Sequence, residues 1–132
     1  MDAREEGGDT VTTATANLKE VLADLTKKPG VIAALVVSRD GFVIEGLTSE
    51  EELDMDALGA LTSSALIGWE SIGADMSTGG PQMLLVEFES GPISVSPVAG
   101  DAVLVVMGNR LCNLGRMRIE ATRVREAVAA CL

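Results

Sequence analysis

The stretch that decides the fold is PGVIAALVVSRDGFVIEG, residues 29–46. Residues 31–38 form an almost continuous apolar run that is rich in β-branched side chains, which predicts a strand buried on both faces. Asp40-Gly41 is a hairpin turn signal, and residues 42–46 are a short returning strand. The stretch therefore predicts a β-hairpin whose first strand lies in the middle of a sheet.

Helical and strand patterns flank this hairpin on both sides. A helix is predicted from about residue 12 to Pro29, because Leu18, Val21, Leu22 and Leu25 recur at helical spacing. Two further helices and three further strands are predicted, the helices over 54–76 and 113–131 and the strands over 82–89, 93–98 and 102–108.

This order of elements, αββαβββα, predicts an α+β protein. Three hairpin connections favour a mainly antiparallel five-stranded sheet. The two wholly apolar strands, 31–38 and 102–108, should be central, with helices covering both of their faces. We therefore expect a helix–sheet–helix sandwich.

The helix predicted over 54–76 is apolar around most of its circumference. One face, which we expect to pack on the sheet, repeats at steps of three and four and contains Met55, Leu58, Thr62, Ala65, Trp69, Ile72 and Met76. The opposite face carries small residues and one isoleucine, namely Ala60, Ser64, Ile67 and Ser71. Because a surface helix normally has a polar outer face, we expect a partner to cover this one; the alternative is a slightly apolar surface helix.

The partner that we expect is a second copy of the chain. The strand over 82–89 would otherwise be an open, apolar sheet edge, which favours aggregation. The sequence therefore predicts a homodimer. The residues that we assign to its interface are Ala60, Ser64, Ile67, Ser71, Met83 and Leu85.

The charge of the chain is strongly asymmetric. Its 20 acidic and 10 basic residues give a net charge of −10, which disfavours nucleic acid and anionic membranes as partners. Half of the basic residues are arginines that follow residue 109. We expect these arginines to be solvated or paired with the acidic remainder of the chain.

No motif predicts an enzyme. The chain has no histidine, which removes the commonest general base and the imidazole metal ligand. Gly79-Gly80 is followed by Pro81 rather than by lysine and a hydroxyl residue, so it is no phosphate loop. We expect a binding or scaffolding protein without catalytic residues, metal or cofactor.

The cysteines and the N-terminus indicate the compartment and the domain limits. Cys112 and Cys131 form no CxxC motif, and the start of the chain is too polar and acidic for a signal peptide. The helix predicted over 54–76 is too interrupted by Gly, Ser and Glu for a membrane span. We predict free thiols in a reducing cytoplasm. Residues 1–11 are predicted to be a disordered acidic lead-in, and residues 12–132 a single domain.

Two stretches give the sequence a family resemblance. Residues 29–46 resemble the opening of the roadblock domain, where a helix is followed by Gly-Val, an apolar strand and an Asp-Gly hairpin. Residues 100–124 resemble its last strand, its Asn-Leu-Gly helix entry and its basic C-terminal helix. The order of elements matches over residues 13–131. The resemblance implies a roadblock/longin-like (profilin-like) sheet in the order 2-1-5-4-3, and dimers in which the middle helix and the third strand meet their counterparts.

The resemblance also implies a function. The sequence is most similar to the prokaryotic regulators of small Ras-like GTPases, of the gliding-protein MglB kind. This implies a non-enzymatic homodimer that binds a Ras-like GTPase, in a GTPase-activating or effector-scaffold role. The alternatives are a structural adaptor that leaves nucleotide turnover unchanged, and a small-ligand sensor, which would need a pocket.

Overall fold

The computed structural model describes residues 17–98 and 100–132. The predicted lead-in at 1–11 and the predicted helix start near residue 12 lie outside these residues. A helical segment occupies residues 17–26 and precedes the first strand. The elements that follow are β1 (Val31–Ser38), β2 (Val43–Thr48), α2 (Met55–Asp75), β3 (Leu84–Phe88), β4 (Gly91–Val98), β5 (Ala102–Gly108) and α3 (Leu114–Cys131).

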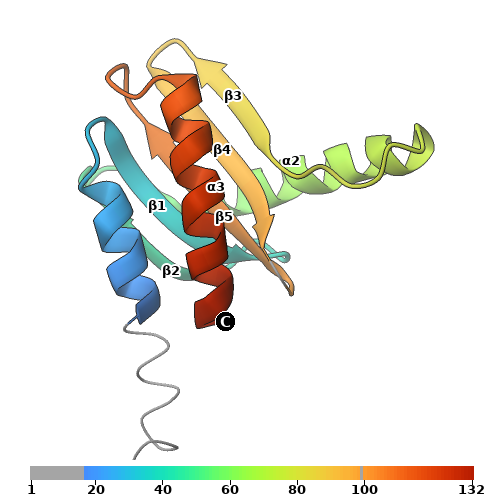
Figure 1. Ribbon diagram of the computed structural model, residues 1–132, viewed down its shortest axis with the longest axis horizontal. Helices are drawn as coiled ribbons and strands as arrows, with labels where there is room; N and C mark the ends of the chain where they lie inside the picture. Colours follow the sequence, from blue (N-terminus) through green and yellow to red (C-terminus); the bar gives the residue numbers. More distant parts are fainter. Residues whose placement is uncertain (1–16, 99) are drawn as a thin grey trace, which may run out of the picture.

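The strands form one antiparallel sheet in the order β2-β1-β5-β4-β3. Helix α2 lies on one face of this sheet, and the 17–26 segment and α3 lie side by side on the other (Figure 1). The predicted α+β helix–sheet–helix sandwich, with its five-stranded sheet and its 2-1-5-4-3 order, is therefore confirmed.

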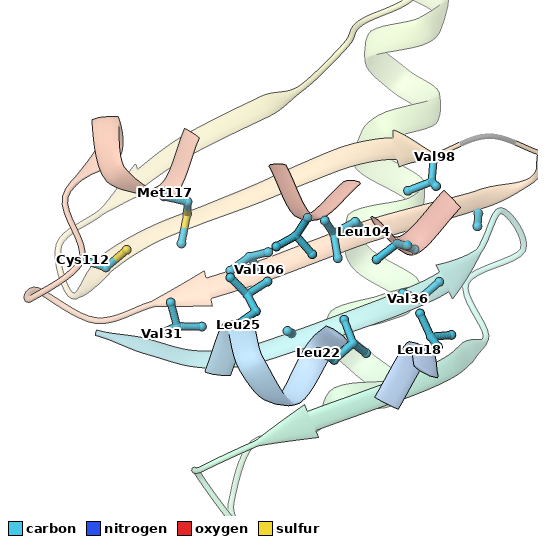
Figure 2. Packing of buried hydrophobic residues seen from close by; sticks show 14 residues of the cluster. Leu18, Leu22, Leu25, Val31, Val36, Val98, Leu104, Val106, Cys112 and Met117 are labelled. Atoms are coloured by element: carbon cyan, nitrogen blue, oxygen red, sulfur yellow. The ribbon is translucent and has the colours of Figure 1, made fainter. Parts of the chain in front are cut away.

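The two strands predicted to be central are central. In β1 and β5 nearly every residue is buried, as the continuous apolar runs of their sequences require. Figure 2 shows the larger core, where Leu22 and Leu25 of the 17–26 segment and Met117 of α3 meet Val36 and Leu104 of the sheet. This face is closed by two helices.

The other face is covered only in part. Helix α2 packs on β1, β2 and β5, and its second half extends beyond the sheet (Figure 1). The α2 residues that become buried are Gly59, Thr62, Ser63, Leu66 and Gly73. The prediction that the stripe from Met55 to Met76 packs on the sheet along its whole length is therefore wrong beyond Thr62. Beyond Thr62 the side of α2 that packs on the sheet continues through Leu66 and not through the stripe, so Ala65, Trp69, Ile72 and Met76 are exposed.

Candidate protein-interaction site

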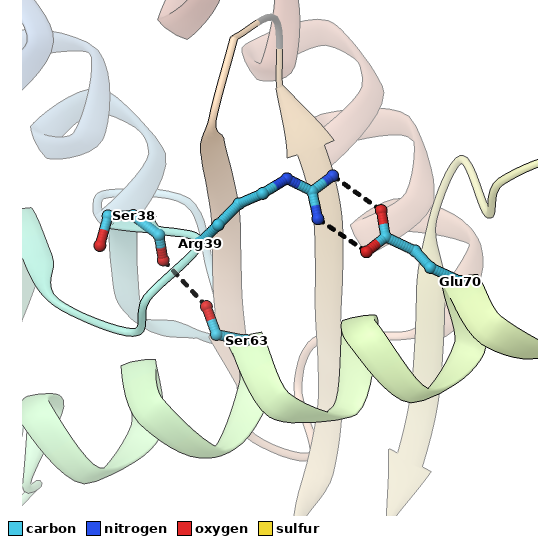
Figure 3. Close-up of polar contacts among 4 residues, drawn as sticks. All are labelled: Ser38, Arg39, Ser63 and Glu70. Atoms are coloured by element: carbon cyan, nitrogen blue, oxygen red, sulfur yellow. Dashed lines mark hydrogen bonds and ion pairs between the residues drawn. The ribbon is translucent and has the colours of Figure 1, made fainter.

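The orientation of α2 is set by polar contacts with the end of β1. The Ser63 hydroxyl donates a hydrogen bond to the carbonyl oxygen of Ser38 at 2.9 Å. Further along the helix, the Arg39 guanidinium donates two parallel hydrogen bonds of 2.7 Å to the two carboxylate oxygens of Glu70 (Figure 3). These contacts hold one side of the helix against the β1–β2 hairpin.

The Arg39–Glu70 pair perturbs both groups. Hydrogen bonding to Arg39 lowers the pKa of Glu70 from its ordinary value, while desolvation acts in the opposite direction. The hydrogen bond to Glu70 raises the pKa of Arg39. Because about a third of each side chain remains exposed, water screens the pair, and it positions the helix more than it stabilises the fold.

Small residues bring α2 close to the sheet. A Cβ atom built on Gly59 would lie 3.3 Å from the Gly41 carbonyl oxygen and 3.3 Å from side-chain atoms of Val37 and Val43. Thr62 and Ser63, also small, are buried on the same side of the helix. Small residues and Leu66 therefore form the inner side of α2, while its other large apolar residues beyond Leu58 face outward.

The outward residues form an apolar surface beside the uncovered part of the sheet. On α2, Leu61 is 70% exposed and Trp69 is 52% exposed, and both lie on one flank of the helix. On β3, Phe88 is 54% exposed. Leu84 packs against the α2-side core, so the two-residue period of the strand places Val86 and Phe88 on this face as well. We call this set the α2–β3 surface; it consists of Leu61, Ala65, Trp69, Ile72, Met76, Val86 and Phe88.

The residues predicted for a dimer interface are divided between two places. Ala60, Ser64, Ile67 and Ser71 are exposed together on the other flank of α2, where Ile67 is the one large side chain. We call these four the small-residue flank. Met83 and Leu85 are half-buried on the opposite face of the sheet. There Leu85 packs against the core beneath α3, and both residues line a cavity next to that helix.

Sequence reasoning missed Leu61, Val86 and Phe88. The signal for the strand residues was present, because in VEFE (residues 86–89) apolar and acidic residues alternate. Leu61 continues the Ala65, Trp69 and Ile72 stripe one turn toward the start of the helix. No local signal shows that α2 turns this stripe away from the sheet.

The described residues contain few other candidate sites. In residues 17–98 and 100–132, no group of three or more His, Cys, Asp or Glu side chains is arranged to hold a metal ion. Within the same ranges, no helix combines the length and the apolar character needed to cross a membrane. Cys112 is buried, Cys131 is half-buried, and both thiols are free, as predicted. Burial raises the pKa of the Cys112 thiol, so it stays protonated at neutral pH.

The sheet order 2-1-5-4-3, with α2 on one face and two helices on the other, defines the roadblock fold class. Residues 17–107 match the family model of the Roadblock/LC7 domain, and the chain belongs to this family. The "Uncharacterized protein MJ1340" of Methanocaldococcus jannaschii is 31% identical over 113 residues, which cover 86% of this chain and 97% of that protein.

Solved structures show the same fold. The gliding protein MglB of Thermus thermophilus superposes with a TM-score of 0.83 at 21% identity, covering 89% of this chain and 90% of that one. A structure described as "MglB with tetrameric arrangement" also gives a TM-score of 0.83 at 21% identity, with 89% of each chain covered. At 21% identity, the similarity to these two structures shows that the fold is shared and nothing more.

Proposed function

We propose that this protein is a homodimeric binding module that regulates a small Ras-like GTPase. The observation that carries the proposal is the α2–β3 surface, a set of large apolar side chains that the protein's own fold leaves uncovered. Family membership and the likeness to MglB support a regulatory module of this kind. The name of one such structure, which states a tetrameric arrangement, supports self-association.

The geometry of β3 favours a second copy as the occupant of this surface. β3 is the outermost strand, so one of its edges has no partner among the described residues. An antiparallel β3 from a second copy would extend the sheet and pair these backbone groups. The same operation would place the two α2 helices next to each other, over the exposed Val86 and Phe88. A two-fold contact of this type is self-complementary, as closed homodimers require.

The small-residue flank is the part of α2 that such a dimer would leave open. Ala60, Ser64 and Ser71 give it a flat surface, and Ile67, 50% exposed, gives it one apolar anchor. We propose that a Ras-like GTPase docks here, across the paired α2 helices. The protein would act by binding the GTP-bound switch loops more tightly than the GDP-bound ones, because a ligand shifts such loops only through differential affinity.

Two substitutions test which of the two surfaces of α2 forms the dimer interface. The isoleucines that they replace, Ile67 and Ile72, are similarly exposed. Ile72→Arg places a charge on the α2–β3 surface and should convert the dimer to a monomer in analytical ultracentrifugation. Ile67→Arg places the same charge on the small-residue flank and should leave the dimer intact. If Ile67→Arg dissociates the dimer and Ile72→Arg does not, the interface lies on the small-residue flank, as the sequence analysis predicted.

The proposal that the protein binds and regulates a GTPase is tested with the Ras-like GTPase encoded closest to this gene in its genome. Calorimetric titration should show tighter binding of the GTPase loaded with a non-hydrolysable GTP analogue than of the GDP form. Ile67→Arg should abolish this binding although the variant remains dimeric. Equal affinity for the two nucleotide states, or no binding, would favour the structural-adaptor function.

A further inference from the structure

Helix α3 has a second surface that the proposed function does not use. Its inner side is buried on the sheet through Met117, Ala121, Val124 and Val128. At about 100° per residue, the residues directly opposite are Gly115, Ile119, Thr122 and Glu126. Ile119 is 67% exposed, and the neighbouring Leu111, just before the helix, is 77% exposed. The outer side of α3 therefore has a narrow strip that is uncharged as far as Thr122 and ends at the carboxylate of Glu126. Ile119 and the preceding Leu111 are its exposed apolar side chains.

Arginines border this strip on both sides. Arg118 and Arg125, seven residues apart, follow one border, and Arg116 and Arg123 follow the other. The Arg123 guanidinium forms an ion pair of 2.7 Å with Glu120. Among the described residues, the other three form no ion pair, although the chain carries 20 acidic side chains. The protein's own carboxylates thus leave most of this positive charge available.

A cavity lies between the Arg118–Arg125 border and the edge of the sheet. Its volume is about 460 Å³, and it is lined by Gln82, Met83, Leu85, Arg118, Thr122 and Arg125. The Arg125 guanidinium donates a hydrogen bond of 2.9 Å to the Gln82 carbonyl oxygen, which fixes its position at the rim. The lining combines the apolar side chains of Met83 and Leu85 with the guanidinium groups of Arg118 and Arg125, an arrangement suited to an acidic side chain with an apolar neighbour.

We propose that the outer side of α3 binds an acidic amphipathic helix of a partner protein. Gly115 and Thr122 are small enough to let a second helix approach, and Ile119 would contact its apolar stripe. Carboxylates on both sides of that stripe would pair with Arg118 and Arg125 on one border and Arg116 on the other. Glu126, at the far end of the strip, would repel further acidic residues and so limit the contact to the part of α3 that precedes it.

The charge of the whole chain favours a short acidic segment over a polyanion. Nucleic acid or an anionic membrane would extend past α3 and meet the field of a protein with a net charge of −10. A helix with a few carboxylates meets only the charges within about a Debye length, ~8 Å at physiological salt. Because α3 and α2 lie on opposite faces of the sheet (Figure 1), this partner could bind while the α2–β3 surface is occupied.

The test uses the full chain and two synthetic peptides. The first peptide has a leucine stripe bordered on both sides by glutamates, and the second has glutamine at every glutamate position. The first should bind in fluorescence anisotropy and shift backbone amide signals of α3 in NMR spectra, and the second should bind at least about tenfold more weakly. Arg118→Glu and Arg125→Glu should each weaken binding of the acidic peptide by about tenfold or more. Lys19→Glu, the same charge change at an exposed site of the 17–26 segment, should leave it unchanged.

Three results would overturn the proposal: equal binding of the two peptides, equal effects of Arg118→Glu and Lys19→Glu, or NMR shifts on α2 rather than on α3. Duplex DNA and phosphatidylserine vesicles are measured in parallel. Tighter binding to either one, lost in Arg118→Glu, would assign the surface to a polyanion and would equally overturn the proposal. Because Ile67 and Ile72 lie on the other face of the sheet, failure here leaves the proposed GTPase regulation unaffected.

Discussion

Arg39 and Glu70 are 31 residues apart in sequence and meet through two hydrogen bonds of 2.7 Å (Figure 3). Arg39 follows β1 directly, and Glu70 lies in the half of α2 that extends beyond the sheet. The pair holds the projecting helix to the hairpin one turn beyond Leu66, the last large apolar side chain of α2 that is buried on the sheet. The geometry of the exposed α2 surface therefore depends on this contact.

Replacing Glu70 with glutamine should lower stability slightly and in a pH-dependent way. The pKa of Glu70 is lowered in the folded protein, so its stabilising contribution is present above the ordinary carboxyl pKa of 4.5 and is lost as the pH falls through the lowered value. We expect Glu70→Gln to cost about 0.2–1 kcal/mol at neutral pH and almost nothing in strong acid. Urea unfolding at both pH values measures this. Glu52→Gln, in an exposed loop, is the control and should have no effect at neutral pH.

Two buried serines in β4 should be dispensable. The hydroxyls of Ser94 and Ser96 lack a hydrogen-bond partner among the described residues, although both side chains are fully buried. Removing an unsatisfied hydroxyl removes a desolvation penalty, so Ser94→Ala and Ser96→Ala should leave the free energy of unfolding unchanged or raise it by about 1 kcal/mol. Ser63→Ala, which deletes the hydrogen bond to Ser38, should instead lower it by about 1 kcal/mol. A clear loss in either β4 variant would show that a buried water satisfies that hydroxyl.

Two glycines should respond to alanine in opposite directions. Gly30 has a φ of +84°, and a Cβ atom there would lie 2.6 Å from the backbone nitrogen of Cys112, so Gly30→Ala should cost about 2 kcal/mol or more. Gly68 lies within α2 with nothing within 4 Å of its Cβ position, so Gly68→Ala should add about 0.5–1 kcal/mol through helix propensity. Thermal unfolding of dilute protein gives both values. A loss at Gly68 would mean that another chain already contacts this position.

The single tryptophan reports directly on the α2–β3 surface. Trp69 is about half exposed in one chain, so its emission maximum should move to shorter wavelengths as rising concentration drives association. The Val86→Lys variant charges the neighbouring strand and should keep the emission of an exposed indole at all concentrations. An unchanged spectrum in the unmodified protein, measured while ultracentrifugation shows a dimer, would place the interface away from Trp69.

The sequence by itself determined the architecture, because its local patterns and the observed burial of the strands and helices agree. The apolar runs of β1 and β5 require burial on both faces, and these two strands are central. The stripes from Leu18 to Leu25 and from Met117 to Val128 repeat at helical spacing, and the larger core forms between them and the sheet. The strand order itself came from the family resemblance, because hairpin signals alone do not say which distant strands pair.

The exposed face of α2 was decided only by the tertiary structure. Periodicity assigns the large apolar side chains to the inside of a helix, but α2 is apolar around most of its circumference and has two candidate inner sides. Gly59 and Ser63 contact β1 closely, and Leu66 packs on the sheet. Arg39 pairs with Glu70 on the same side of the helix, and together these contacts set the rotation of α2. Trp69 and Ile72 consequently face outward. Such contacts join residues that are distant in sequence, so no local pattern encodes which flank of the helix remains open.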